Sequence, residues 1–190
     1  MKFYVSMALA VILMGGSVNA QHVNIGVKGG LNVYNINNDN GVKYDSKTGL
    51  HLGLLGHIHL NKIWAVQPEL VYSSQGAKYN FSSSETKLNL NYINVPVLLQ
   101  YMFDNGFRLQ AGPQVGFLIS AKTGNGTDVK DDFKGIDFGL GLGAGYIKPS
   151  TGLGVDVRYN LGISNINENS SVKSTNRGFQ LGVFYQFKHK

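Results

Sequence analysis

Residues 136–146 read IDFGLGLGAGY, and this stretch decides the fold. Apolar or aromatic side chains occupy every second position, and the positions between them hold Asp137 and four glycines. Side chains alternate across a β-strand, so the stretch presents one apolar face and one nearly empty face. A water-exposed strand would only lose stability from four glycines, whereas the crowded interior of a narrow barrel needs them to make room for large side chains. The stretch therefore predicts one strand of a small closed barrel.

Seven further segments alternate in the same way. They are Val23–Tyr34, Thr48–Leu60, Ile63–Ser73, Leu88–Tyr101, Phe107–Ser120, Leu153–Leu161 and Phe179–Phe187. In the segment from Leu88, the apolar face begins with Leu88, Leu90 and Tyr92 and then continues from Ile93, so the phase slips by one residue and predicts a β-bulge near Tyr92. Pro68 removes one ladder donor and predicts a bulge or local strain relief.

The connections between these segments alternate in length. Short connections cover residues 61–62, 102–106 and 148–152, and long polar ones cover residues 37–47, 74–87, 121–134 and 164–176. In an up-and-down meander, alternate connections emerge at the same end, so one rim carries the short turns and the other carries the long loops. This asymmetry is typical of outer-membrane barrels. The predicted fold class is all-β, an eight-stranded antiparallel up-and-down transmembrane β-barrel.

The composition agrees with an alternating chain. Charged residues make up only 15% of the 190 residues, yet the mean hydropathy of −0.08 is too polar for a helical membrane protein. The absence of cysteine excludes a disulfide framework, a thiolate metal site, a cysteine nucleophile and a lipid-bearing cysteine. The net charge of +6 is scattered rather than gathered on a face interleaved with aromatic residues, which disfavours nucleic-acid binding.

Residues 1–20 have the layout of a secretory signal peptide. Lys2 precedes an apolar stretch from Phe3 to Met14, and small residues end the segment at Ala20. The apolar stretch is shorter than the roughly 20 residues that a membrane-spanning helix needs. We expect cleavage after Ala20, which leaves residues 21–190 as the barrel domain.

Alternation alone does not say which face meets lipid, because a soluble lipocalin-like barrel would alternate equally well. Three basic and three acidic residues occupy the polar faces, as expected for charges paired in a closed lumen: Lys28, Glu69, Arg108, Asp137, Asp156 and Arg158. Aromatic residues on the apolar faces gather near the two rims, as expected of girdles at the bilayer interfaces. Those near the short turns are Trp64, Tyr101, Phe107, Tyr146 and Phe187, and those near the long loops are Tyr72, Phe117, Phe138, Tyr159 and Phe179.

No residue set predicts a catalytic, cofactor or metal site. His57 and His59 lie on one strand face without an acidic partner, and the spacing of Asp128, Asp131 and Asp132 lacks the calcium-loop pattern. A Ser/His/Asp hydrolase acting on lipid would need a histidine and a serine on the lipid-facing surface. Each histidine within a predicted strand is on the opposite face. We therefore expect no enzyme activity and no cofactor.

In order along the chain, six stretches resemble the PorT-like outer-membrane β-barrel domains of Gram-negative bacteria. They are GVKGGLNVYNI (26–36), AVQPELVYSSQG (65–76), YINVPVLLQY (92–101), AGPQVGFLIS (111–120), IDFGLGLGAGY (136–146) and VRYNLGISNI (157–166). The resemblance implies an eight-stranded barrel inserted by the barrel-assembly machinery. In that family the last strand ends in an aromatic residue, and here Phe187 is followed by three further residues.

Together these features predict an exported protein of the Gram-negative outer membrane, in contact with its lipid and lipopolysaccharide. Four long loops would act in adhesion or envelope integrity, or bind a protein partner in a larger envelope complex. The alternatives are a small lipid-modifying enzyme in the same membrane and a soluble carrier of a hydrophobic ligand.

Overall fold

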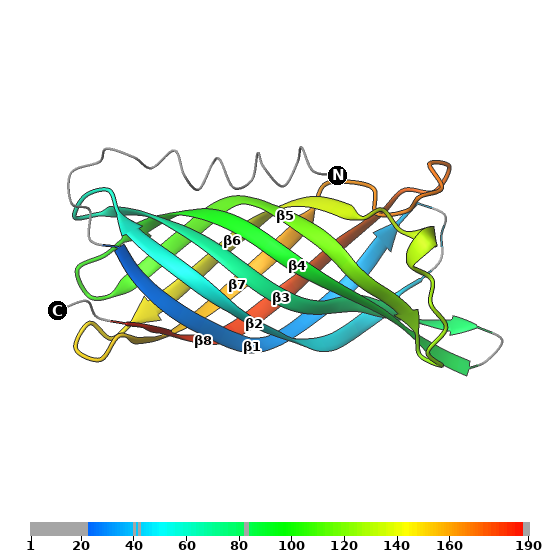
Figure 1. The fold of residues 1–190 in the computed structure, drawn as a ribbon, viewed down its shortest axis with the longest axis horizontal. Helices are drawn as coiled ribbons and strands as arrows, with labels where there is room; N and C mark the ends of the chain where they lie inside the picture. The colour runs from blue at the N-terminus through cyan, green and yellow to red at the C-terminus, as the bar shows by residue number, and fades with distance from the viewer. Residues whose placement is uncertain (1–22, 40, 42, 82–83, 188–190) are drawn as a thin grey trace.

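The computed structural model describes residues 23–39, 41, 43–81 and 84–187. Within these ranges the chain forms eight antiparallel strands, each paired with the next along the sequence, and β8 pairs with β1 to close a barrel (Figure 1). The strands are β1 (Val23–Asn38), β2 (Asp45–His59), β3 (Trp64–Phe81), β4 (Ser84–Met102), β5 (Phe107–Thr123), β6 (Ile136–Ile147), β7 (Leu153–Gly162) and β8 (Ser174–Gln186). The predicted fold class is confirmed. The predicted signal peptide, residues 1–20, lies outside the described residues.

Alternation dictates which side chains face outward. The outer surface is apolar, with Leu52 67% exposed and Leu181 60% exposed, whereas Lys28 and Gln180 on neighbouring inward positions are buried. The described part of the chain contains no helix that is long and apolar enough to cross a bilayer. An apolar outer wall around a polar interior is the reverse of a soluble carrier, whose apolar face would line the ligand cavity.

The glycines of β6 make room inside the barrel, as expected. A methyl group at Gly141 would approach Arg158 Cδ to 3.2 Å, and one at Gly143 would approach Gln110 Nε2 to the same distance. On β7, a side chain at Gly154 would collide with the ring of Phe184. The interior of an eight-stranded barrel is just wide enough for side chains to fill. These glycines lack side chains at the points where long side chains of other strands pack.

Three local expectations about strands and loops need correction. Residues 74–87 are not a loop, because β3 continues to Phe81 and β4 begins at Ser84, and this hairpin projects beyond its neighbours (Figure 1). Composition misleads here, since the extension is rich in Ser, Asn and Lys on its outer side but places Ala77 and Leu88 inside. At Pro68 the β3–β4 register is the same on both sides, so a bulge in that pairing is wrong, and local strain relief, the alternative, stays a prediction.

The predicted bulge near Tyr92 exists, but its extra residue belongs to the partner strand. Asn91 pairs with Ser120 and Tyr92 pairs with Leu118, which leaves Ile119 of β5 unpaired. The faces of β4 therefore do not exchange. Leu88, Leu90 and Tyr92 point into the barrel together with Asn94 and Gln100, rather than onto the apolar outer face as the sequence pattern indicated.

Candidate functional site

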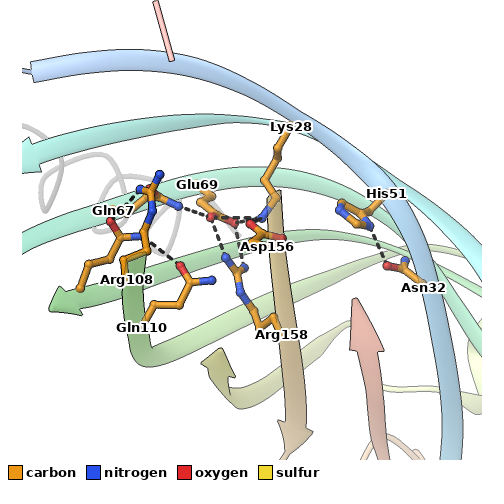
Figure 2. Close-up of polar contacts among 10 residues, drawn as sticks. Lys28, Asn32, His51, Gln67, Glu69, Arg108, Gln110, Asp156 and Arg158 are labelled. Atoms are coloured by element: carbon orange, nitrogen blue, oxygen red, sulfur yellow. Dashed lines mark hydrogen bonds and ion pairs between the residues drawn. The ribbon is translucent and has the colours of Figure 1, made fainter. Parts of the chain in front are cut away.

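A buried ion-pair network of four residues fills the middle of the lumen, and we call it the lumen quartet: Lys28, Glu69, Asp156 and Arg158. Arg158 Nη2 and Nη1 donate to the two Glu69 oxygens at 2.8 and 2.9 Å, and Lys28 Nζ lies 3.0 Å from Asp156 Oδ2 and 3.4 Å from both Glu69 oxygens (Figure 2). All four residues are at most 4% exposed. The charges of the quartet sum to zero.

The quartet joins strands that are not neighbours. Glu69 on β3 and Arg158 on β7 lie four strands apart in a ring of eight, so their bidentate contact spans the lumen. Gln67 Nε2 also donates to Glu69 Oε1 at 2.7 Å. Such a bidentate arginine–carboxylate pair has fixed geometry as well as strength. Because it spans the lumen, it leaves little open space there.

The other two residues predicted for this network form hydrogen bonds with residues outside the quartet. Arg108 Nη1 donates to Gln100 Oε1 at 3.3 Å, and its guanidinium stacks over the Phe184 ring, 4.5 Å from the centroid. Asp137 lies toward the long loops, where it accepts hydrogen bonds from Ser164 Oγ at 2.7 Å and Asn176 Nδ2 at 3.1 Å. The six predicted residues thus do not form one network of direct ion pairs. Arg108 lies beside the quartet, within electrostatic range of Asp156 and Glu69, and Asp137 lies apart from it (Figure 2).

Between the quartet and the long loops the interior becomes apolar. The sequence pattern did not predict this feature. Its buried members, which we call the apolar cap, are Ile36, Ala77, Leu88, Leu90, Tyr92, Leu118, Ala121 and Ile166. Partly buried Tyr44, Tyr79, Val129 and Phe133 pack against them. The alternation within β4 could have indicated this apolar interior. Leu88, Leu90 and Tyr92 are even-numbered and share a face with Asn94 and Gln100, not with Val95 and Leu99. The cap lies inside the barrel at the long-loop end.

The aromatic residues predicted as girdles all project from outward positions. Eight of the ten are exposed, and Trp64 and Tyr159 are half-buried because they pack against Tyr101 and Phe179, with ring centroids 5.1 and 4.8 Å apart. Strand pairing arranges them in rows. Phe107 is opposite Tyr146 near the short turns, and Phe179 is opposite Tyr159 near the long loops.

The histidines and the loop aspartates form no metal site of three or more ligands among the described residues. His51 and His57 point into the lumen, where His51 Nδ1 lies 2.8 Å from Asn32 Oδ1 and the His57 and His59 rings pack edge to face. Asp128 Oδ1 accepts a hydrogen bond from the Lys130 amide, and Asp131 and Asp132 belong to the short helix η1 (Lys130–Asp132).

Backbone hydrogen bonds bind the long loops to one another. The β5–β6 and β7–β8 connections meet through Lys134 N to Ile166 O at 2.8 Å and Glu168 N to Asp132 O at 3.0 Å, and the Asp39 amide donates to Lys173 O at 3.2 Å. A pocket of about 410 Å³ lies at this rim, and we call it the rim pocket. Its lining combines aromatic rings with three carboxylates: Tyr44, Tyr79 and Phe133 with Asp131, Asp132 and Glu168.

Tyr44 and Tyr79 pack edge to face in the rim pocket, with ring centroids 6.0 Å apart. Burial, and to a lesser extent the neighbouring Tyr79, raises the pKa of the Tyr44 hydroxyl. The phenol is therefore a neutral hydrogen-bond donor at physiological pH. Aromatic faces beside carboxylates attract cationic groups.

A closed barrel with an apolar wall, buried polar side chains inside and long loops at one end defines a transmembrane β-barrel of the outer membrane. The chain belongs to the outer membrane protein β-barrel domain family, whose sequence profile matches residues 19–168. This membership places the protein in the outer membrane of a Gram-negative bacterium, as expected. No curated protein sequence matches the chain.

Solved structures with this fold include several bacterial surface proteins. The chain is similar to Neisserial surface protein A (16% identity, TM-score 0.63, covering 87% of this chain and 99% of that one). It is also similar to Ail, the attachment invasion locus protein of Yersinia pestis (16% identity, TM-score 0.53, covering 86% of this chain and 98% of that one). A third similar structure is OprG of Pseudomonas aeruginosa (14% identity, TM-score 0.51, covering 89% of this chain and 98% of that one). At these identities the likeness extends to the fold.

Proposed function

We propose that this barrel is a non-catalytic display protein whose loops bind a partner at the cell surface, in adhesion, envelope integrity or as an accessory partner of an envelope complex. The proposal rests on the arrangement of the long connections at the rim. Three long connections are joined there by backbone hydrogen bonds around the rim pocket, while the lumen quartet and the apolar cap fill the interior. A preorganised surface loses less entropy on binding than mobile loops would.

The chemistry of the rim pocket favours a cationic partner, such as a lysine or arginine side chain of a protein. Among the described residues that line it, every charged one is acidic. Ail carries attachment in its name, and one of its structures contains the heparin analogue sucrose octasulfate. That ligand is a polyanion, so on this proposal the present chain would share the display architecture with Ail but take a partner of opposite charge.

We extend the proposal to the rest of the molecule. The lumen quartet acts as a structural plug, and the two rows of aromatic residues lie at the bilayer interfaces, in contact with lipid and lipopolysaccharide. The six stretches quoted above support assignment to the PorT-like group within the family, and therefore insertion by the barrel-assembly machinery.

The test is affinity capture from detergent-solubilised envelopes and, separately, adhesion of cells that display the protein. A rim variant combines Asp131→Asn, Asp132→Asn and Glu168→Gln, and the matched control is Asp104→Asn in a short turn at the opposite end. We expect the wild type and the control to bind the same partner or surface and the rim variant to lose it. Equal binding by all three proteins would refute the proposal.

A further inference from the structure

A second cavity opens at the short-turn end of the barrel, and nothing in the proposed function uses it. It has a volume of about 300 Å³ and extends from exposed turn residues, including Lys62 and Asp104, to buried Arg108. His57, His59 and Gln186 also line it. We call this cavity the Arg108 pocket.

Arg108 has hydrogen-bonding capacity that the protein leaves unused. Its side chain is buried, yet among the described residues Nε and Nη2 have no hydrogen-bond partner, and Nη1 donates to Gln100. Within the same part of the chain, His57 Nδ1 and Gln186 Nε2 also lack partners, and both residues are more than nine-tenths buried. Buried polar atoms are rarely left unpaired, because each loses its bonds to water without compensation. Unpartnered polar atoms from three strands therefore converge on one cavity.

The charge of Arg108 has no carboxylate of its own, because Asp156 and Glu69, which act on it electrostatically, pair directly with Lys28 and Arg158. The lumen quartet is neutral by itself, and Asp137 is engaged with Ser164 and Asn176 toward the other end. The stacking of the guanidinium on Phe184 covers one of its faces and leaves its edge free. Among the described residues that line the pocket, Asp104 is the sole carboxylate, and it lies on the exposed rim. A buried cation without a directly paired counter-ion is unfavourable, and an anion from outside would reduce that cost.

We propose that the Arg108 pocket binds an oxyanion, either a phosphate or a carboxylate group, at the short-turn end of the barrel. Arg108 supplies the charge and two donors, Gln186 supplies an amide donor, and the His57 ring lies at the wall. Phe103, Phe107 and Phe187 line the outer part of the same cavity, and Phe107 and Phe187 belong to the outward aromatic row. The oxyanion can thus be free in solution or be the head group of an amphiphile whose chain follows these rings.

The experiment uses the folded full-length barrel in an uncharged detergent and isothermal titration calorimetry. One arm titrates inorganic phosphate, and the other titrates dihexanoyl phosphatidylglycerol below its micelle-forming concentration. We expect saturable binding in the wild type and a loss of about tenfold or more in affinity for Arg108→Gln, since a charge-assisted pair is removed. Arg177→Gln is the matched control, because Arg177 is an exposed strand arginine near the long loops, and it should bind as the wild type does.

The two arms distinguish the sources of the oxyanion. Equal affinities identify a free anion, whereas tighter binding of the lipid that Phe103→Ala abolishes identifies an amphiphile. Folding is checked by the heat-dependent shift of the barrel on a gel, and Gln186→Leu, which keeps the arginine, should weaken phosphate binding in the same direction. Absence of saturable binding in the wild type, or undiminished binding by both Arg108→Gln and Gln186→Leu, would overturn the proposal.

Discussion

Glu69 accepts hydrogen bonds from Arg158, Lys28 and Gln67, and it is the carboxylate on which both cations of the lumen quartet converge. Its removal leaves Lys28 and Arg158 buried with only Asp156 to balance them. Breaking a buried ion pair in this way is far costlier than replacing the whole pair, because one charge stays buried without a partner. The quartet should therefore behave as one coupled unit.

We predict that Glu69→Gln lowers the free energy of unfolding by about 3–5 kcal/mol. The double variant Glu69→Gln/Arg158→Gln restores neutrality and keeps the Lys28–Asp156 pair, so it should lose less than the sum of the two single variants. Urea titration of the folded barrel in lipid vesicles, followed by Trp64 fluorescence, measures all three proteins. Additive losses would show that the quartet is not coupled.

Gly154 allows Phe184 to lie across the lumen and to stack with Arg108. We predict that Gly154→Ala destabilises the barrel by about 1–3 kcal/mol, because the new methyl group meets the Phe184 ring and lies 2.6 Å from the Tyr146 carbonyl oxygen. The control is Gly56→Ala on β2, where the nearest atom is Pro68 Cγ at 3.6 Å. The same urea titration compares them, and an equal effect of the two substitutions would contradict the steric account.

At the scale of elements, strand alternation was enough to predict all eight strands and their order, because a two-residue period is dictated by the strand itself. The exact ends of β3 and β4 were not predictable in the same way. Where the barrel rises above the bilayer, its outer face turns polar, and Lys78 or Asn89 then resembles a loop residue in composition. The inward Ala77 and Leu90 continue the alternation of the strands. Their apolar side chains did not identify them as inward residues, because the lumen is otherwise polar.

The bulge shows a second limit of one-strand patterns. A change of face near Tyr92 was predicted at the right place in the sheet, yet the extra residue is Ile119 on β5. Because β4 has apolar residues on both faces, its sequence looks as if its alternation shifted by one residue. The strand that holds the extra residue of the bulge can be identified only from the pairing of β4 with β5. For the same reason the sequence pattern placed Asp137 in one network with Lys28 and Glu69. Alternation gives the face of a residue but not its height in the lumen.

The apolar cap should respond to truncation as a soluble protein core does. We predict that Leu90→Ala costs about 2–5 kcal/mol, since Leu90 is fully buried and the cavity has nothing to fill it. Leu54→Ala, on the outer wall, should cost less, because lipid tails occupy the space that the side chain leaves. Chemical unfolding in vesicles distinguishes the two, and a larger loss for Leu54→Ala would show that the cap is not a packed core.

At the scale of the whole molecule, two layers obstruct the lumen: the lumen quartet in its middle and the apolar cap at the long-loop end. We predict that the barrel reconstituted in a planar lipid bilayer shows no steady ion conductance. The triple variant Leu88→Ser/Leu90→Ser/Glu69→Ala, which weakens both layers, should increase the frequency of open events if it still folds. Stable channels in the wild type would contradict a plugged interior.

The orientation of the strands places their apolar outer faces against hydrocarbon and their opposite faces inside a closed barrel. Nitroxide labels at Leu140 on β6 and Val183 on β8, both outward and exposed, test this orientation in reconstituted vesicles by electron paramagnetic resonance. We predict frequent collision with membrane-dissolved oxygen and protection from a water-soluble nickel chelate at both positions. Accessibility to the chelate with protection from oxygen would contradict it.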